Sequence, residues 1–574
     1  MMKTIHNWQR MGAGLGAGVM ALWLGCSSPD EYYNDADKEV YTILNNRQNQ
    51  VLGEKDEFDI NTPFSNRLPE AIPPSEIIKE RFSEGTNTLT LASALEMAVK
   101  NSRDYQLQRE TLYLSALSLT GERHKFALRF TGANVDLELD RATGGDTSTS
   151  SDASFTLSKA LDGGGKVTAR LADNLKIYFD GSGPKVPGLT FTLTQPLLKG
   201  SGKDMALESL TQSERNLVYS IRSFSRYQEK FLVDRTSDYL NLLLTQMQLR
   251  VEYQLLQNRM RFREEQELRL QGELISQFEL DQALRQEYET KNNYISRVES
   301  YLSSLDAFKK QLNLPLGKEL VLDNSELPEL EEIGVSQVPL SDEYGFQLAL
   351  TNRLDILNEV DKFQDKKRKV KVAKNDLLPS LGLVADYSLK DQYYNQNSFD
   401  FGDYSAKAGL SLDLALDKLS ERNAYRKSRI DFERQLRSLM ETMDGLLDEL
   451  RKNVRSLERN RQSYIINKKK LEASQRELEK ARLDLLVGDR VRPRDILEAQ
   501  SGVARARNTY YSSLINFHIQ RLKLLNNAGI LDTAPQNWWR ETQQIPGIQP
   551  LESGDEADED LPVVPPDEIL GTNE

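Results

Sequence analysis

"GFQLALTNRLDILNE", residues 345–359, repeats the pattern of "ALEMAVKNSRDYQLQ", residues 94–108, at an offset of 251 residues. Three pairs of identical residues fall on one another: Ala98 and Ala349, Asn101 and Asn352, and Asp104 and Asp355. Self-similarity at a fixed offset indicates that a chain is built from repeated units. We therefore expect two halves with a common plan.

A second match lies at two segments that begin with glycine. "GELISQFELDQA" starts at Gly272 and "GDRVRPRDILEA" starts at Gly488, and their alignment places Glu279 on Asp495. The same alignment pairs Leu280 with Ile496 and Ala283 with Ala499. The two matches together define a first repeat over residues 88–325, a linker over 326–337 and a second repeat over 338–530.

Each half contains a segment that predicts a very long helix. Residues 204–271 contain neither proline nor glycine, and residues 419–487 are interrupted only by Gly445. Leu240, Leu243 and Met247 follow a helical stripe, and about 68 residues at 1.5 Å each span about 100 Å. Such a helix cannot fold back into a compact globule, so the stripe must be covered by its return helix and by neighbouring subunits, as in a coiled coil.

Alternating apolar and polar residues predict strands ahead of both long helices. "GLTFTLTQPLL" places Leu189, Phe191 and Leu193 on one face, and residues 381–389 and 408–416 alternate in the same way. In "ALRFTGANVDLELD" the apolar positions change phase around Gly132, which predicts a β-bulge. Strict alternation fits a transmembrane strand or a half-buried strand of a soluble sheet, and the strands alone favour neither.

An additional hairpin is predicted near residues 153–175, with its turn at Gly163–Gly165. It either lengthens an outer loop or adds strands to the sheet.

The N-terminal residues resemble the signal of a bacterial lipoprotein. Met1 to Arg10 is basic, and "MGAGLGAGVMALWLG" is an apolar run of about fifteen residues, too short to span a bilayer as a helix. Cys26 follows as the only cysteine of the chain, so it cannot form an internal disulfide. We expect residues 1–25 to be a signal peptide and Cys26 to carry a lipid; an ordinary signal peptide with a stray cysteine is the alternative.

Composition and motifs argue against nucleic-acid binding and against catalysis. The net charge is −13, whereas phosphate contacts need an excess of Lys and Arg. The chain has three histidines, without metal-binding spacing, and it has no glycine-rich phosphate loop. Beyond the signal it has no apolar run of eighteen residues. We expect no enzyme activity, no cofactor and no metal.

The repeated order of helix, strands, long helix and returning helix resembles the TolC-type outer-membrane efflux proteins. "ALTNRLDILNE", "LLPSLGLVADYS" and "TQPLLKGSG" carry the resemblance, which covers nearly all of residues 88–530. It implies an α+β membrane protein with an internal twofold repeat. Three protomers, each giving four strands, would form one outer-membrane β-barrel, which a long α-helical coiled-coil barrel continues across the periplasm.

The same resemblance implies a passive duct of a tripartite efflux or type I secretion system. The expected partners are two further copies of the chain, a periplasmic adaptor, an inner-membrane pump and outer-membrane lipid. A structural or adhesive coiled-coil lipoprotein without a pore is the alternative. The expected location is the cell outer membrane, with a lipid anchor and an extension into the periplasm.

The resemblance also assigns roles to the two glycine-marked turns. "DILEA" matches the motif of the family, so Asp495 and Glu498 are candidates for acidic rings that constrict the periplasmic entrance; a solvated helix start is the alternative. Residues for the periplasmic tip and the adaptor contact are Gly272, Glu279, Asp281, Gly488, Arg490, Arg492 and Arg494. The three arginines either face the adaptor or pair with the two acids in the closed state.

The flanking segments are polar. We expect residues 26–87 to be an extended segment that leads away from the lipid anchor. Residues 531–574 end in an acidic, proline-rich run without Lys or Arg after Arg540, and we expect this tail to be disordered.

Overall fold

The computed structural model describes residues 28–53, 58–141, 147–178, 185–336, 338, 340–390, 403–414, 416–487, 493–533 and 538–540. The chain divides into two compact units. The first, here called the sheet unit, draws on Met1–Ile60, Arg109–Ile221 and Gln364–Glu433. The second, the helix unit, draws on Asn61–Gln108, Arg222–Phe363 and Arg434–Glu574. Both units therefore take residues from both halves of the sequence.

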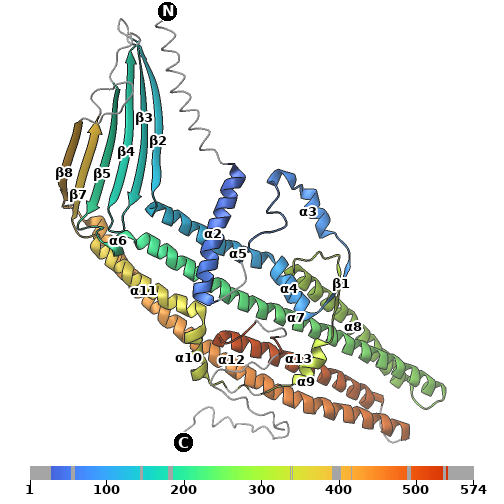
Figure 1. Ribbon diagram of the computed structural model, residues 1–574. Coiled ribbons are helices and arrows are strands. Elements are labelled where there is room, and N and C mark those ends of the chain that lie inside the picture. The colour runs from blue at the N-terminus through green and yellow to red at the C-terminus, as the bar shows by residue number, and fades with distance from the viewer. Residues whose placement is uncertain are drawn as a thin grey trace, which may run out of the picture. The chain divides into compact units, whose positions relative to one another are not determined.

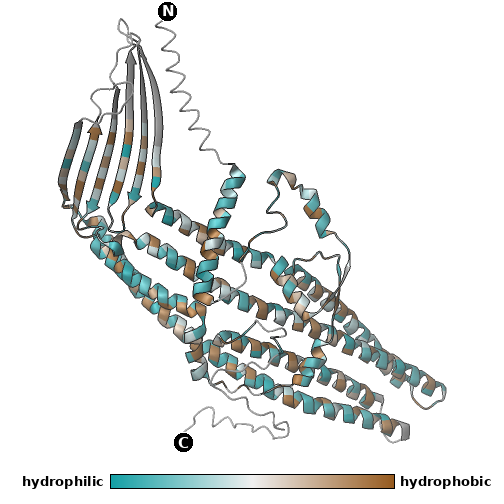
Figure 2. Cartoon of the chain, in the orientation of Figure 1, coloured by the Kyte–Doolittle hydropathy of each residue, from teal (hydrophilic) through white to brown (hydrophobic). Residues whose placement is uncertain are grey.

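The sheet unit is built around six antiparallel strands in the order β2-β3-β4-β5-β7-β8 (Figure 1). The strands are β2 (Arg129–Arg141), β3 (Thr147–Ala160), β4 (Lys166–Tyr178), β5 (Lys185–Pro196), β7 (Ser380–Lys390) and β8 (Asp403–Asp413). The register of β2 against β3 shifts between Phe130 and Gly132, which confirms the predicted bulge. Hydrophobic and polar residues alternate along the described parts of the strands (Figure 2).

The hairpin predicted near residues 153–175 is formed by β3 and β4, and both strands lie inside the sheet. The expected four strands per protomer are therefore corrected to six in the part of the chain that the structure describes. This hairpin therefore adds strands to the sheet and does not lengthen an outer loop.

Helix α2 (Pro29–Leu52) lies within residues 26–87, where an extended segment is expected, and the structure corrects that expectation for these residues. A capping box begins the helix: the Ser28 amide donates to Glu31 Oε2 at 3.0 Å and the Glu31 amide donates to Ser28 Oγ at 3.2 Å. Val40 and Leu44 are fully buried. Two short helices follow, η1 (Pro69–Ala71) and α3 (Pro74–Arg81).

Long helices follow both sets of strands. After α6 (Lys203–Ala206), helix α7 (Glu208–Gln271) runs for 64 residues and returns as α8 (Gln277–Gln311). Helix α12 (Leu419–Val487) runs for 69 residues over the predicted range and returns as α13 (Pro493–Ala528). Shorter helices precede the strands: α4 (Leu91–Asn101), α5 (Arg103–Phe126), α10 (Asp342–Asn352) and α11 (Leu354–Asn375).

The helix unit contains two elements that are not predicted from the sequence. Strand β1 (Thr86–Leu89) pairs in parallel with β6 (Glu319–Leu322). Helix α9 (Glu326–Ile333) occupies most of the expected linker. The Tyr510 hydroxyl of α13 donates to Glu331 of α9 at 2.7 Å and lies 3.2 Å from the Tyr464 hydroxyl of α12, so the linker is packed against the long helices.

Helices that could serve as membrane spans are absent from the described residues, because none of them is both long enough and apolar enough.

Candidate functional site

The first glycine-marked turn connects α7 to α8 and ends in a capping box. Glu273 has a φ of 56°, a left-handed conformation that tight turns use. The Ser276 amide and hydroxyl donate to Glu279 Oε2 at 2.8 Å and 2.9 Å. Glu279 therefore satisfies a free amide at the start of α8. Asp281 is exposed and accepts a hydrogen bond from Gln277 Nε2 at 2.9 Å.

The second turn connects α12 to α13. Pro493 occupies the first helical position of α13, where its missing N–H costs nothing. Arg494, Asp495 and Glu498 are exposed, whereas Ile496 is 2% exposed. Since residues three apart share a helix face, the two carboxylates lie on one solvent-facing side of α13. Gly488, Arg490 and Arg492 lie outside the described residues.

The two helical hairpins pack against each other beside these turns. A buried cluster joins Phe262 of α7, Ala283 of α8, and Ile496 and Leu497 of α13. Ala481 and Leu485 of α12 pack against it. All four helices therefore share one apolar contact, and the exposed acids lie on the opposite side of α13.

The apolar positions that the sequence alignment pairs are buried in both hairpins. Leu280 and Ala283 of α8 are 8% and 2% exposed, and Ile496 and Ala499 of α13 are 2% and 5% exposed. In the alignment of the two glycine-marked segments, these buried positions of α8 thus fall on buried positions of α13.

Arg259 of α7 is a buried cation that no pattern in the sequence predicts. Its side chain is 1% exposed, and Nη2 donates to the Leu497 carbonyl at 2.6 Å and to Ser501 Oγ at 2.5 Å. Burial lowers the pKa of the guanidinium to about 10, although Glu289 and Glu252 act against that shift. The only sequence signal is position: Arg259 precedes the buried Phe262 by three residues on the apolar face of α7.

A second arginine of α7 joins the two arms of the first hairpin. Arg263 Nε donates to Glu287 of α8 at 2.9 Å, and Nη1 donates to Glu267 of α7 at 2.9 Å. Hydrogen bonds to the two carboxylates raise the pKa of the guanidinium above its ordinary value. The pairing fixes the α7–α8 register about one turn from Arg259.

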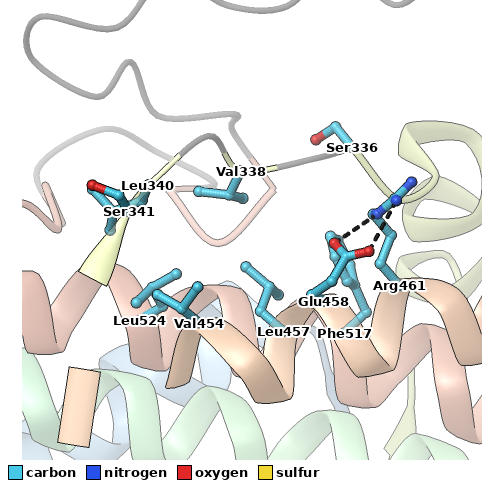
Figure 3. A pocket seen from close by; sticks show the side chains of 10 residues that line it. All are labelled: Ser336, Val338, Leu340, Ser341, Val454, Leu457, Glu458, Arg461, Phe517 and Leu524. Carbon is cyan, nitrogen blue, oxygen red and sulfur yellow. Dashed lines mark hydrogen bonds and ion pairs between the residues drawn. The ribbon is translucent and has the colours of Figure 1, made fainter. Parts of the chain in front are cut away.

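A cavity of about 390 Å³ lies elsewhere in the helix unit, below the segment that leads into α10 (Figure 3). Its floor is apolar apart from one ion pair, in which Arg461 donates to Glu458 at 3.0 Å. Ten residues line it: Ser336, Val338, Leu340, Ser341, Val454, Leu457, Glu458, Arg461, Phe517 and Leu524. The two charged side chains are paired with each other, and the Ser341 hydroxyl accepts a hydrogen bond from the Tyr344 amide at 3.2 Å, so these polar groups are engaged in local contacts.

Trp538 and Trp539 lie in the tail over residues 531–574 that is expected to be disordered, but each is packed at 4% exposure, which corrects the expectation for these residues. Trp539 Nε1 donates to the buried Glu326 at 3.2 Å, and Arg540 Nε donates to the same carboxylate at 2.9 Å. His518 of α13 is fully buried, and burial lowers the pKa of the imidazole to about 3, so it is neutral at physiological pH. The described residues hold no cluster of three or more metal-binding side chains.

Two kinds of comparison with known proteins gave matches, and both point to outer-membrane channels. The family model described as "Outer membrane efflux protein" matches residues 345–529. The comparison with curated proteins found no match.

Several solved structures have a similar fold at low identity. The CmeC outer membrane channel of Campylobacter jejuni is 13% identical, with a TM-score of 0.56 over 76% of this chain and 85% of that one. The open-state MtrE outer membrane channel of Neisseria gonorrhoeae is 13% identical, with a TM-score of 0.55 over 77% and 89%. The outer membrane protein VceC of Vibrio cholerae is 13% identical, with a TM-score of 0.52 over 76% and 96%. Residues 345–529 thus match the model of the outer membrane efflux protein family, and the chain has the fold of these outer-membrane channels.

Proposed function

We propose that the chain is a passive channel of the outer membrane that works in a tripartite efflux or type I secretion system. The match of residues 345–529 to the outer membrane efflux protein family carries this proposal. The likeness to solved channels supports it, since it extends over about three quarters of the chain. An inner-membrane pump and a periplasmic adaptor supply the driving force and the solute, and the chain itself performs no chemistry.

The working form is a homotrimer in the cell outer membrane that extends into the periplasm. A six-stranded sheet has two open edges, and an open edge is not viable in lipid, so several copies must close the wall together. Cys26, acylated after removal of residues 1–25, attaches each protomer to the membrane. Multiple acyl chains on three protomers make release from the bilayer slow.

The periplasmic entrance lies where the two helical hairpins end. Asp495 and Glu498 are exposed on one side of α13, while Ile496 and Leu497 hold that helix in the apolar cluster. Three copies of the exposed pair around an axis form two acidic rings that favour cations. Glu279 and Asp281 lie in the first turns of α8, in the neighbouring hairpin. The surface that meets the adaptor is formed by these two residues together with Gly272, Gly488, Arg490, Arg492 and Arg494.

Single-channel recording in planar bilayers tests the channel and its entrance together. The purified protein is expected to conduct with a preference for cations. The double variant Asp495→Asn, Glu498→Gln is expected to reduce that preference several-fold, because it removes six charges from a trimer. Glu70→Gln, which changes an exposed acid in η1, is the matched control.

A complete lack of conductance, also with both entrance acids replaced, would contradict the channel and favour a structural coiled-coil lipoprotein. If the double variant conducts with unchanged ion selectivity, the channel function is supported and the proposed acidic rings are contradicted.

A further inference from the structure

The additional hairpin formed by β3 and β4, here called the inserted hairpin, is a full member of the sheet. Strand β3 pairs with β2 from Arg129↔Ser158 to Arg141↔Thr147, and with β4 from Ser148↔Tyr178 to Ala160↔Lys166. Strand β4 pairs with β5 from Lys166↔Thr194 to Leu175↔Lys185. The inserted strands thus have a neighbour on each side along most of their length, as interior strands do.

One apolar row crosses all six strands in register. It consists of Phe130, Leu157, Ala169, Phe191, Tyr387 and Ala406. The row directly beside it, on the opposite face, is polar: Arg129, Ser158, Thr168, Thr192, Asp386 and Lys407. Because successive residues of a strand point to opposite faces, the sheet has one apolar side and one polar side, and both continue through β3 and β4.

The apolar side is about as exposed on the inserted strands as on β5 and β7. Phe155 of β3 and Leu171 of β4 are 45% and 43% exposed, and Phe191 of β5 and Tyr387 of β7 are 41% and 42% exposed. A continuous apolar band on one side with polar residues on the other is the pattern of a membrane β-barrel wall. At these positions the inserted strands therefore have the same apolar, exposed character as their neighbours, and Lys159 of β3 is the charged residue that lies on the same side beyond Leu157.

The turn of the inserted hairpin packs against the segment between β5 and α6 and is hydrogen-bonded to it. The Gly163 carbonyl accepts hydrogen bonds from Gln195 Nε2 at 3.0 Å and from the Gly202 amide at 3.2 Å. Gly164 has a φ of 90°, and a Cβ there would lie 2.5 Å from the Gly200 carbonyl oxygen. Such close packing fixes the hairpin where β5 leaves the sheet.

The two edges of the sheet are suited to join copies of the chain. Strands alternate in direction through the sheet, so with six strands the edge strands β2 and β8 run in opposite directions. Strand β8 of one copy can therefore pair with β2 of the next in an antiparallel ladder, as the other strands do. Repetition of this contact about an axis closes a ring and leaves no open edge.

We propose that three copies of this chain close an eighteen-stranded wall, six strands from each, in place of the twelve-stranded wall that four strands per protomer would give. This inference rests on the proposed channel function and deepens it. Barrel diameter grows about linearly with strand number, so the wall is about 1.5 times wider. Barrels of this size enclose an aqueous lumen, and the polar row faces it. The wall thus accommodates bulky, hydrated solutes such as oligosaccharides.

Disulfide cross-linking tests the contact between copies. Phe130→Cys on β2 is combined in turn with Tyr404→Cys, Ala406→Cys, Ala408→Cys or Leu410→Cys on β8, all on the apolar side. A disulfide requires Cα atoms about 4.4–6.8 Å apart, so only paired edges react. We expect one or two of these pairs to give a covalent ladder that stops at three copies. Phe130→Cys with Phe191→Cys on the interior strand β5 is the control and should give no ladder.

Electron microscopy of the full chain in nanodiscs tests the width. Deletion of residues 147–178 removes both inserted strands and leaves an even number, so the edges still match. The deletion variant is expected to have a barrel diameter about one third smaller than the wild type, and wild-type images alone should show a wall of eighteen strands. An unchanged diameter, a wild-type wall of twelve strands, or a ladder that stops at another number would overturn the inference.

The outcomes separate the wall from the channel. If the protein conducts but gives no β8–β2 cross-links, the eighteen-stranded wall is contradicted and the channel function is supported. Cross-linked rings of the expected width that do not conduct would contradict the channel and keep the wall.

Discussion

Arg259 Nη2 lies 2.6 Å from the carbonyl oxygen of Leu497, and this hydrogen bond ties the first helical hairpin to the second. The guanidinium is 1% exposed and also contacts Ser501 Oγ. A buried cation held by neutral acceptors is sensitive to any movement of α7 against α13, because water cannot replace the lost partners.

Replacement of Arg259 by alanine should therefore loosen the contact between the hairpins. It leaves the Leu497 carbonyl and the Ser501 hydroxyl without their donor, at a cost of about 1–3 kcal/mol. Hydrogen exchange of the α13 amides near Leu497 should accelerate. Arg261→Ala, at an exposed position of the same helix, is the control and should change little. Equal effects of the two variants would contradict the role of Arg259.

Loss of the Glu279 carboxylate should weaken the start of α8. Glu279→Ala removes the acceptor of the Ser276 amide, and loss of a cap costs about 0.5–2 kcal/mol. Thermal unfolding and exchange of the first α8 amides measure this cost. Glu279→Gln keeps an acceptor and should retain most of the stability. If alanine and glutamine behaved alike, the cap would not be the reason that Glu279 matters.

Gly164 should tolerate no side chain. Its φ of 90° disfavours L residues, and a Cβ would meet the Gly200 carbonyl at 2.5 Å. Gly164→Ala is expected to cost about 1–3 kcal/mol in unfolding experiments on the full chain. Gly163→Ala is a close control, because its Cβ would meet Gln195 at an ordinary 3.7 Å. Similar stability of the two variants would show that the turn can relax.

Asp365 should make part of the stability of the sheet unit dependent on pH. Burial raises the pKa of its carboxyl, but hydrogen bonds from Tyr219 and Gln212 and the charges of Arg215 and Arg368 outweigh burial and hold the pKa below the ordinary value. The Tyr219 hydroxyl lies 2.7 Å away. A lowered pKa contributes stability above the unfolded value of about 4, and this contribution is lost as pH falls through the folded value.

The corresponding variant is Asp365→Asn. Compared with the wild type, it should be less stable at neutral pH and should lose less stability between about pH 5 and pH 2, as measured by urea unfolding. Glu441→Gln, at an exposed position of α12, is the control. If Asp365→Asn lost as much stability as the wild type between about pH 5 and pH 2, Asp365 would not be a source of the pH dependence.

The elements with strong periodicity were predictable from the sequence. The long helix α12 has the predicted bounds, because no proline and only one glycine interrupt residues 419–487. The bulge near Gly132 was visible as a change of phase in the apolar positions. Both features depend on local sequence, which is why they could be read without knowledge of the fold.

Features that depend on partners distant in sequence were not predictable. Helix α2 lacks a strong apolar stripe, although its capping box at Ser28 and Glu31 is a signal that could have been used. The capping box at Ser276 and Glu279 is a signal of the same kind for the start of α8. The burial of Arg259 depends on α13, more than 200 residues away in the chain, and local sequence does not encode that contact.

The alternating direction of the strands imposes a parity rule on the evolution of this sheet. An insertion of one strand would turn one edge around and prevent it from meeting the next copy in an antiparallel ladder. An insertion of two strands, like β3 and β4, leaves both edges as they were. The proposed wall can therefore be widened by duplication of a hairpin without any change in the edge strands through which its copies would assemble.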